Sequence, residues 1–228
     1  MKLHLLKDFS VPVGDEICQS KMEVRNLGVK LSNVMSMSNH IDSICRISFM
    51  HLRTISNIRQ YLSTEATKTL VHGLVLSRID YANSLLCSAP DYLLAKLQRV
   101  QNSAARIITK TPKFDHVTPV LMSLHWLPIK QRIDFKVLLL VFKALKNVAP
   151  GYICDLLQLR TAPRTLRSST SQFLVTPACR TVTYGDKCFS CYAPKLWNSL
   201  PASIRNAGSV PTFKKQLKTF LFKQAFNL

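Results

Sequence analysis

The chain has 228 residues, 47% of them hydrophobic, and this content excludes a wholly disordered chain because it is enough to bury a core. Its 31 Lys and Arg residues outnumber its 12 Asp and Glu residues, which gives a formal net charge of +19 at pH 7. So large an excess of positive charge repels itself in a compact protein. The charge therefore favours a strongly acidic partner, and nucleic acid is the first candidate.

The positive charge is concentrated toward the C-terminal third of the sequence. Residues 156–228 hold 11 basic residues and one carboxylate, Asp186, for a net +10, against +9 for the first 155 residues. A membrane surface is also acidic, but the longest apolar run is VLLLVF at residues 137–142, far too short to span a bilayer. Charged residues interrupt the N-terminal stretch before a secretory apolar region is complete, so no signal peptide is expected.

Residues 10–34 mix turn-forming residues with short β-prone runs, a pattern that predicts a small hairpin or two edge strands. From residue 40 the pattern becomes helical, because apolar residues recur at three- and four-residue steps through about residue 62. The expected buried stripe of this helix is Ile41, Ile44, Cys45, Phe49, Leu52 and Ile55.

A second helical stretch is predicted from residue 63 to about residue 86. Ser63 or Thr64 can cap its start, and Glu65 in the first turn suits the helix dipole. The apolar series of this stretch is Leu70, Leu74, Ile79 and Leu85.

A third helix opens at Pro90 and Asp91. Its apolar residues fall three or four apart and form one expected buried stripe of Leu93, Leu97, Val100, Ala104 and Ile107. Beside the stripe runs a basic row of Lys96, Arg99, Arg106 and Lys110. The row suits a helix that packs on a core while it holds cations toward a polyanion, although a solvated basic face has the same local spacing.

Three prolines punctuate residues 110–128 and predict a turn, a short helix and a second turn. Pro128 then begins a strong helix. Between Val137 and Leu145 its only charge is Lys143, so we expect this segment at the centre of the core. A stop signal at residues 150–151 and a short helix over 152–159 follow.

The rest of the sequence begins with a small, polar and basic segment at 160–171, which predicts an exposed loop or linker. Two short β-prone runs over 172–187 precede a helical stretch at 188–201. The final helix, 211–226, is amphipathic, with Phe213, Leu217, Phe220 and Leu221 on one face and Lys214, Lys215, Lys218 and Lys223 on the others.

No motif for catalysis accompanies these elements. Metal-dependent nucleotidyl transfer needs carboxylates close together, and Asp15 and Glu16 are the only adjacent acids in the sequence. None of the six glycines belongs to a phosphate-binding loop. We therefore expect no enzyme, no metal site and no bound cofactor.

The cysteines, histidines and tryptophans leave alternatives open. Seven widely spread cysteines do not resemble a disulfide framework and fit a reducing, intracellular compartment, cytoplasm or nucleus. Cys188 and Cys191 form a CxxC, which indicates either a zinc or redox pair or two small apolar residues lining a helix. His125 is a candidate base or a hydrogen-bonded neighbour of Trp126. Trp126 and Trp197 are expected either to anchor helices or to stack on unpaired bases.

Several phrases of the sequence, taken in order, carry a resemblance to a known family. They include VRNLGVKLSNVMSMSNHI, LVLSRIDYANSLL, LQRVQNSAARIIT, HVTPVLMSLHWLPIKQRIDFKVLLLVFKAL and YGDKCFSCYAPKLWNSLP. Together they resemble the C-terminal part of the polyprotein of LINE-type, non-LTR retrotransposons of the jockey-like kind. The resemblance covers residues 13–228, and LHWLP together with APKLWNSLP makes it specific.

The resemblance implies a position downstream of a reverse transcriptase active site. The expected units are a palm-end remnant with short strands at 1–39, a helical thumb-like domain at 40–158 and a basic α+β C-terminal unit at 159–228. The expected fold class is thus mainly α, a helical thumb-like bundle with a small N-terminal β hairpin. The family's catalytic Tyr/Phe-Ala-Asp-Asp motif, its endonuclease residues and the zinc-knuckle spacing of some relatives have no counterpart in this sequence.

Thumb helices of polymerases lie along the primer and template, so the resemblance favours phosphate contacts that position nucleic acid without reading bases. From spacing and charge we predict such contacts for a set of basic residues, Lys96, Arg99, Arg106, Lys110, Arg53, Arg59, Arg78, Arg164, Arg167, Lys214, Lys215 and Lys218. The expected partner is RNA or DNA, bound without sequence preference. Two other interpretations stay open, a decayed fragment and a helical protein-interaction module that docks Leu217, Phe220 and Leu221 into a partner.

Overall fold

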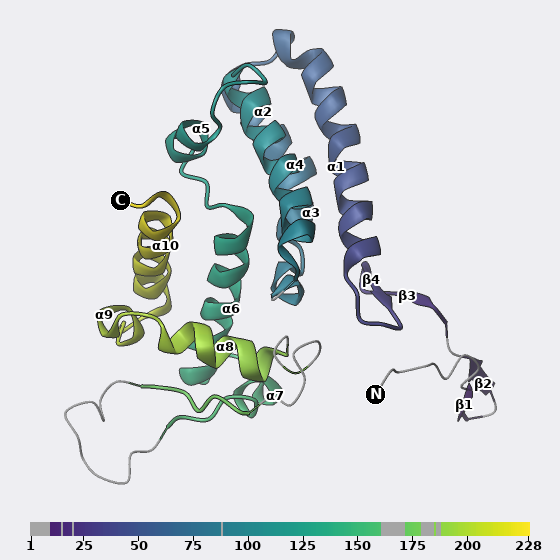
Figure 1. Cartoon of the computed structure of the whole chain (residues 1–228), viewed down its shortest axis with the longest axis vertical. Helices are drawn as coiled ribbons and strands as arrows, with labels where there is room; N and C mark the ends of the chain where they lie inside the picture. Colours follow the sequence, from purple (N-terminus) through teal and green to yellow (C-terminus); the bar gives the residue numbers. More distant parts are fainter. Residues whose placement is uncertain are drawn as a thin grey trace.

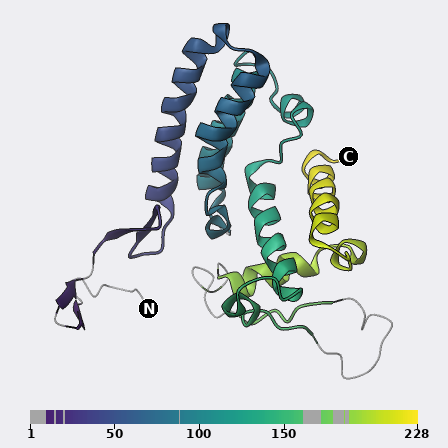
Figure 2. The same ribbon diagram turned by 180° about the vertical axis from the view of Figure 1, so that it is seen from behind.

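The structure, a computed structural model, describes residues 10–14, 16–19, 21–87, 89–160, 172–178, 185 and 188–228. These residues form a mainly helical protein, which confirms the predicted fold class. Figure 1 shows long helices standing side by side, with α8 crossing the lower part of α6 and two small hairpins beyond the foot of α1. Figure 2 shows the same arrangement from behind.

The N-terminal strands form two separate antiparallel hairpins. Strand β1 (Ser10–Val13) pairs with β2 (Glu16–Gln19), and β3 (Glu23–Asn26) pairs with β4 (Val29–Ser32). The second hairpin turns through two residues, Leu27 and Gly28, that both have positive φ, at 46° and 84°. Two positive φ angles in a two-residue loop match the twist of paired strands, and glycine adopts such an angle without steric cost.

Helices α1 (Ser38–Ile58) and α4 (Asp91–Thr109) lie parallel to each other, and α1 is the outermost helix on its side of the protein (Figure 1). In α4 the predicted stripe is buried at Leu93, Leu97, Val100 and Ala104, while Ile107 is half-buried. In α1 the stripe was predicted incorrectly at Phe49, which is 43% exposed. The buried line of α1 runs instead through Ser48.

The chain returns between α1 and α4 through a helix that runs without a break over residues 64–80, with short 3-10 turns before and after it. The elements are the 3-10 turn η1 (Arg59–Tyr61), α2 (Thr64–Val71), the π-helical turn η2 (His72–Leu76), α3 (Ser77–Asp80) and the 3-10 turn η3 (Asn83–Leu86). Ser63 caps α2, as predicted, because its hydroxyl accepts a hydrogen bond from the Ala66 amide at 3.1 Å. Leu74 and Leu85, predicted as apolar core residues, are exposed.

The second half of the chain packs around one central helix, as the sequence predicted. Its elements are α5 (Thr118–Ser123), α6 (Ile129–Leu145), α7 (Gly151–Cys154), α8 (Phe189–Asn198), α9 (Ala202–Arg205) and α10 (Val210–Phe226). In α6, Val137, Leu138 and Val141 are fully buried. The ring of Phe142 stacks on Phe213 of α10 with centroids 4.1 Å apart. The core is continuous from α1 to α10.

Candidate nucleic-acid interface

An open groove of about 560 Å³ lies between α1 and α4. Its lining residues are Arg46, Phe49, Met50, Leu52, Arg53 and Ser56 from α1 and Ser103 and Ile107 from α4. Arg46, Phe49, Met50 and Arg53 follow the spacing i, i+3, i+4, i+7, so they form one stripe along α1. The groove therefore combines two guanidinium groups with an exposed apolar strip.

The two helices that border this groove are tied together at both ends. Near their N-termini, the Lys96 ammonium of α4 pairs with the Asp42 carboxylate of α1 at 2.6 Å. Near their C-termini, the Arg59 guanidinium donates to the carbonyl oxygens of Ile107 and Ile108, each at 2.9 Å. The groove thus lies between two fixed crosslinks of side chains.

The prediction that Arg59 contacts a phosphate is wrong, because its side chain is buried and does not face solvent. It also donates to the Leu62 carbonyl at 2.8 Å and to the Thr64 hydroxyl at 3.4 Å. The last carbonyls of a helix have no partner within the helix and carry partial negative charge, which suits a guanidinium with donors in a rigid fork. Arg59 is a structural crosslink and is not available to a phosphate.

Arg106 is likewise occupied by hydrogen bonds to main-chain carbonyl oxygens. Its guanidinium donates to the carbonyl oxygens of Pro112 and of Asp115, the latter at 2.6 Å, and so holds the loop that follows α4. Lys96 is compensated by Asp42, as described above. Lys110 ends α4 with a left-handed backbone, at φ 57°, and is exposed. The predicted basic row of α4 is therefore only half available to a ligand.

The rest of the predicted basic set is exposed where the structure describes it. Within the described part of the chain no carboxylate pairs with Arg53, Arg78, Arg99, Lys110, Lys214, Lys215 or Lys218. Arg164 and Arg167 lie outside the described residues. Helix α10, with its three lysines, stands on the far side of α6 from α1 in both views (Figures 1 and 2). The predicted basic residues that the structure describes are not gathered on one face, and among them Arg53 alone lines the groove.

Sequence reasoning missed Arg46, Phe49 and Met50 as candidate ligand contacts. A signal was present, since residues 46, 49, 50 and 53 share one helical stripe that is offset from the apolar one. The apolar character of Phe49 concealed it, because a phenylalanine near a helical period is expected in the core.

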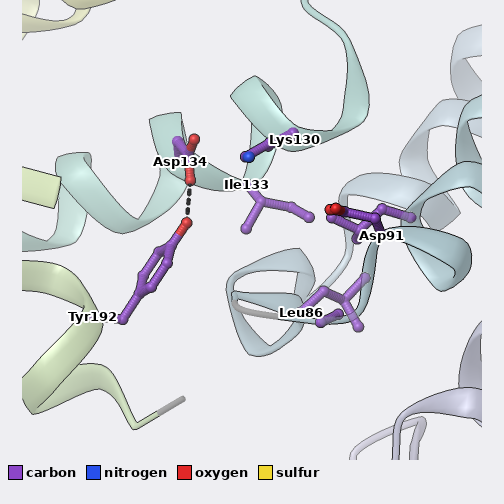
Figure 3. A pocket seen from close by; sticks show the side chains of 8 residues that line it. Leu86, Asp91, Lys130, Ile133, Asp134 and Tyr192 are labelled. Atoms are coloured by element: carbon purple, nitrogen blue, oxygen red, sulfur yellow. Dashed lines mark hydrogen bonds between the residues drawn. The ribbon is translucent and has the colours of Figure 1, made fainter. Parts of the chain in front are cut away.

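A second, smaller cavity of about 150 Å³ lies where α4, α6 and α8 meet. Figure 3 shows Asp134 and Tyr192 pointing toward each other on one side of it, and the Tyr192 hydroxyl donates to the Asp134 carboxylate at 2.6 Å. Burial raises the pKa of Asp134, while the Tyr192 hydrogen bond and the Lys130 charge oppose the rise. This small cavity lies between helices and contains a polar contact, so it is not an open surface on which a nucleic-acid chain could lie.

The two tryptophans are buried, so the stacking alternative is wrong for both. Trp126 meets the edge of the His72 ring with centroids 5.6 Å apart, and the His125 ring lies 5.9 Å from that of Phe222. Trp197 is fully buried, and its indole N–H donates to the Gln172 carbonyl at 2.8 Å. Both anchor helices.

Cys188 and Cys191 do not act as a pair in this structure. Cys188 is a free, exposed thiol, whereas Cys191 is disulfide-bonded, which the cysteine pattern did not predict. Across the described residues no three His, Cys, Asp or Glu side chains converge as a metal site would require. None of the helices traced in those residues is long and apolar enough to cross a membrane.

Leu217 and Leu221 of α10 are buried, and Phe220 is half-buried and packs against the core. The docking face proposed for a protein-interaction module is therefore already covered by this chain. Comparison of the chain with known protein families, with curated proteins and with solved structures finds no match.

Proposed function

We propose that this chain is a non-catalytic C-terminal piece of a retrotransposon RNA-directed DNA polymerase that binds the backbone of RNA or DNA through exposed cations. The observation that carries the proposal is the groove between α1 and α4, where Arg46 and Arg53 are exposed and make no ion pair with a described carboxylate. The net charge of +19 supports the same partner class.

Exposed apolar side chains on the N-terminal hairpins support the fragment part of the proposal. Val13, Ile17 and Leu27 are all largely exposed. Apolar surface of this kind normally meets another domain or chain. A palm domain, to which the resemblance assigns the neighbouring sequence, would supply such a partner.

The test is a salt titration of binding to a labelled oligonucleotide, followed by fluorescence anisotropy. Each phosphate neutralised adds about 0.7 to 0.9 to the slope of log affinity against log salt. We expect a steep linear loss of affinity with salt for the native chain. The double variant Arg46→Gln/Arg53→Gln is expected to lower that slope by about 1.5.

A matched control is Lys214→Gln/Lys215→Gln, which removes the same charge from α10, away from the groove. We expect a smaller loss of affinity than for the arginine variant. A flat salt response of the native chain contradicts the proposal, as does equal loss in both double variants. Primer extension with magnesium is expected to give no incorporation above background, and incorporation would contradict the non-catalytic part.

A further inference from the structure

Phe49 holds an exposed aromatic ring at the middle of the groove, between the two arginines. It is 43% exposed and its neighbour Met50 is 57% exposed, although both line the groove rather than a flat surface. Neither belongs to the hydrophobic core or to the partly buried side chains that pack against it. The exposed part of their apolar surface is not covered by the described chain.

We propose that the groove binds single-stranded nucleic acid, with one unpaired base stacked on Phe49 and the neighbouring phosphates held by Arg46 and Arg53. This inference rests on the proposed function and narrows it from nucleic acid in general to unpaired strands.

Double-stranded and single-stranded nucleic acid present different groups to such a groove. A duplex presents phosphates and sugars on its outside, while the faces of its bases are covered by stacking. A single strand presents phosphates and free base faces together. Proteins that bind single strands combine cations along the backbone with aromatic side chains on which bases stack. Phe49 between two guanidinium groups supplies both contacts on one helix.

The spacing along α1 fits this arrangement. Arg46 and Arg53 are seven residues apart, which at the helical rise separates their Cα atoms by about 10 Å. Phe49 and Met50 lie between them on the same stripe. Two long, flexible arginines can therefore reach phosphates on either side of a base that lies on Phe49. The methionine thioether adds a soft, adaptable contact beside the ring.

The electrostatic surroundings favour an anionic chain over a protein segment of mixed charge. The single carboxylate of α1 is Asp42, one helical turn before Arg46, and it is already paired with Lys96 at 2.6 Å. On the other side of the groove, the lining residues are Ser103, whose hydroxyl donates to the Arg99 carbonyl at 2.9 Å, and Ile107, and neither side chain carries a charge. The groove is thus positively charged along its length.

No other aromatic residue of the described chain lines the groove. The two tryptophans are buried. Tyr152 is an exposed aromatic residue on α7, 71% exposed, but it does not line the groove. It therefore supplies a matched control for a base-stacking test.

The experiment compares binding of a labelled 20-nucleotide single strand and the matching 20-base-pair duplex by the full chain and its variants. Phe49→Ala is expected to weaken single-strand binding at least about fivefold, the low end for one base stacked on an aromatic side chain. It should leave duplex binding unchanged. Phe49→Trp should restore single-strand binding and show quenching of its own fluorescence when a base stacks on it. Tyr152→Ala should change neither.

The possible failures are distinguishable. If Phe49→Ala binds the single strand as well as the native chain does, the stacking inference is overturned, while a persistent salt slope leaves the proposed function standing. Should neither oligonucleotide bind with a salt-dependent affinity, both fail together. Loss of duplex binding as well as single-strand binding in Phe49→Ala, with no restoration by Phe49→Trp, also overturns the inference because it indicates a structural role for the ring.

Discussion

The guanidinium of Arg59, directly after α1, donates to the main-chain carbonyl oxygen of Ile108 at the end of α4, at 2.9 Å. Arg59 also donates to the Ile107 carbonyl at the same distance. The two hydrogen bonds join the C-terminal ends of two parallel helices, although Ile107 and Ile108 are 48 and 49 residues away from Arg59 in sequence. A buried charge held by several carbonyls stabilises only as long as all partners are present.

Replacing Arg59 by alanine is expected to lower the free energy of unfolding by about 3 kcal/mol, because helix carbonyls are left without donors. Arg59→Lys should recover only part of this loss, since one ammonium cannot reproduce the fork of the guanidinium. Urea unfolding measures both. The control is Arg53→Ala, an exposed change on α1, expected to stay within about 0.5 kcal/mol. Equal losses at the two positions would contradict the crosslink.

Replacing Asp42 by asparagine is expected to strengthen nucleic-acid binding, because it releases Lys96 from its ion pair beside the groove. The slope of log affinity against log salt should rise by about 0.7 to 0.9, the contribution of one more phosphate contact. The cost in stability should be below about 1 kcal/mol for a partly exposed pair. Anisotropy at several salt concentrations measures the effect.

The matched control for that variant is Glu65→Gln, which frees Lys68 from an exposed pair at 2.7 Å on α2. Its change in net charge is the same, but Glu65 and Lys68 are on α2, whereas Asp42 and Lys96 are on the two helices that border the groove. We expect a smaller gain in affinity. A gain equal to that of Asp42→Asn would show that net charge alone controls binding.

Asp134 makes stability depend on pH. Its pKa is raised in the folded protein, mainly by burial, so the folded chain holds this proton more tightly than the unfolded chain does. The resulting stabilisation is present below the ordinary pKa of an aspartate and is lost as pH rises through the raised value. At neutral pH the buried charge is therefore a net cost.

Asp134→Asn is expected to be more stable than the native chain at pH 7, and the difference should shrink as the pH falls to about 4 or below. The asparagine oxygen can still accept from the Tyr192 hydroxyl, whose contact Figure 3 shows. Thermal unfolding across pH measures the difference. A native chain that is more stable than Asp134→Asn at pH 7 would contradict the expected sign.

Phe213 joins α10 to the rest of the protein. Its ring is fully buried and stacks on Phe142, so Phe213→Ala should cost about 3 to 5 kcal/mol in urea unfolding. Phe114→Ala supplies the contrast, because that ring is 93% exposed, and we expect a change within about 0.5 kcal/mol. Similar costs for the two variants would contradict a shared core between α6 and α10.

Helical periodicity predicted the long helices well, because a buried stripe of regular spacing leaves few other structures open to α4, α6 and α10. It failed at Phe49, since the buried line of α1 passes through Ser48, and hydrophobicity gives no sign that a serine will be buried. The helix predicted from residue 63 to about residue 86 runs without a break over residues 64–80, but it contains the π-helical turn η2 and ends at Asp80, before the 3-10 turn η3.

The candidate interface was less predictable than the fold. Charge and spacing identify cations on a helix, but not which of them main-chain carbonyls will occupy. Arg59 and Arg106 both donate to main-chain carbonyls. Two of the carbonyl partners of Arg59, those of Ile107 and Ile108, come from a helix that is distant in sequence. Arg46 was overlooked because its importance depends on Ser103 and Ile107 across the groove. Such partners are set by tertiary packing, which one sequence does not reveal.

The buried link between α1 and α4, in which Arg59 donates to the carbonyl oxygens of Ile107 and Ile108, has a thermodynamic consequence. It holds the two walls at a set separation before any ligand arrives. A strand that enters then loses its own freedom of motion, while the backbones of the two helices have little left to lose, and preorganisation of this kind raises affinity without any added contact.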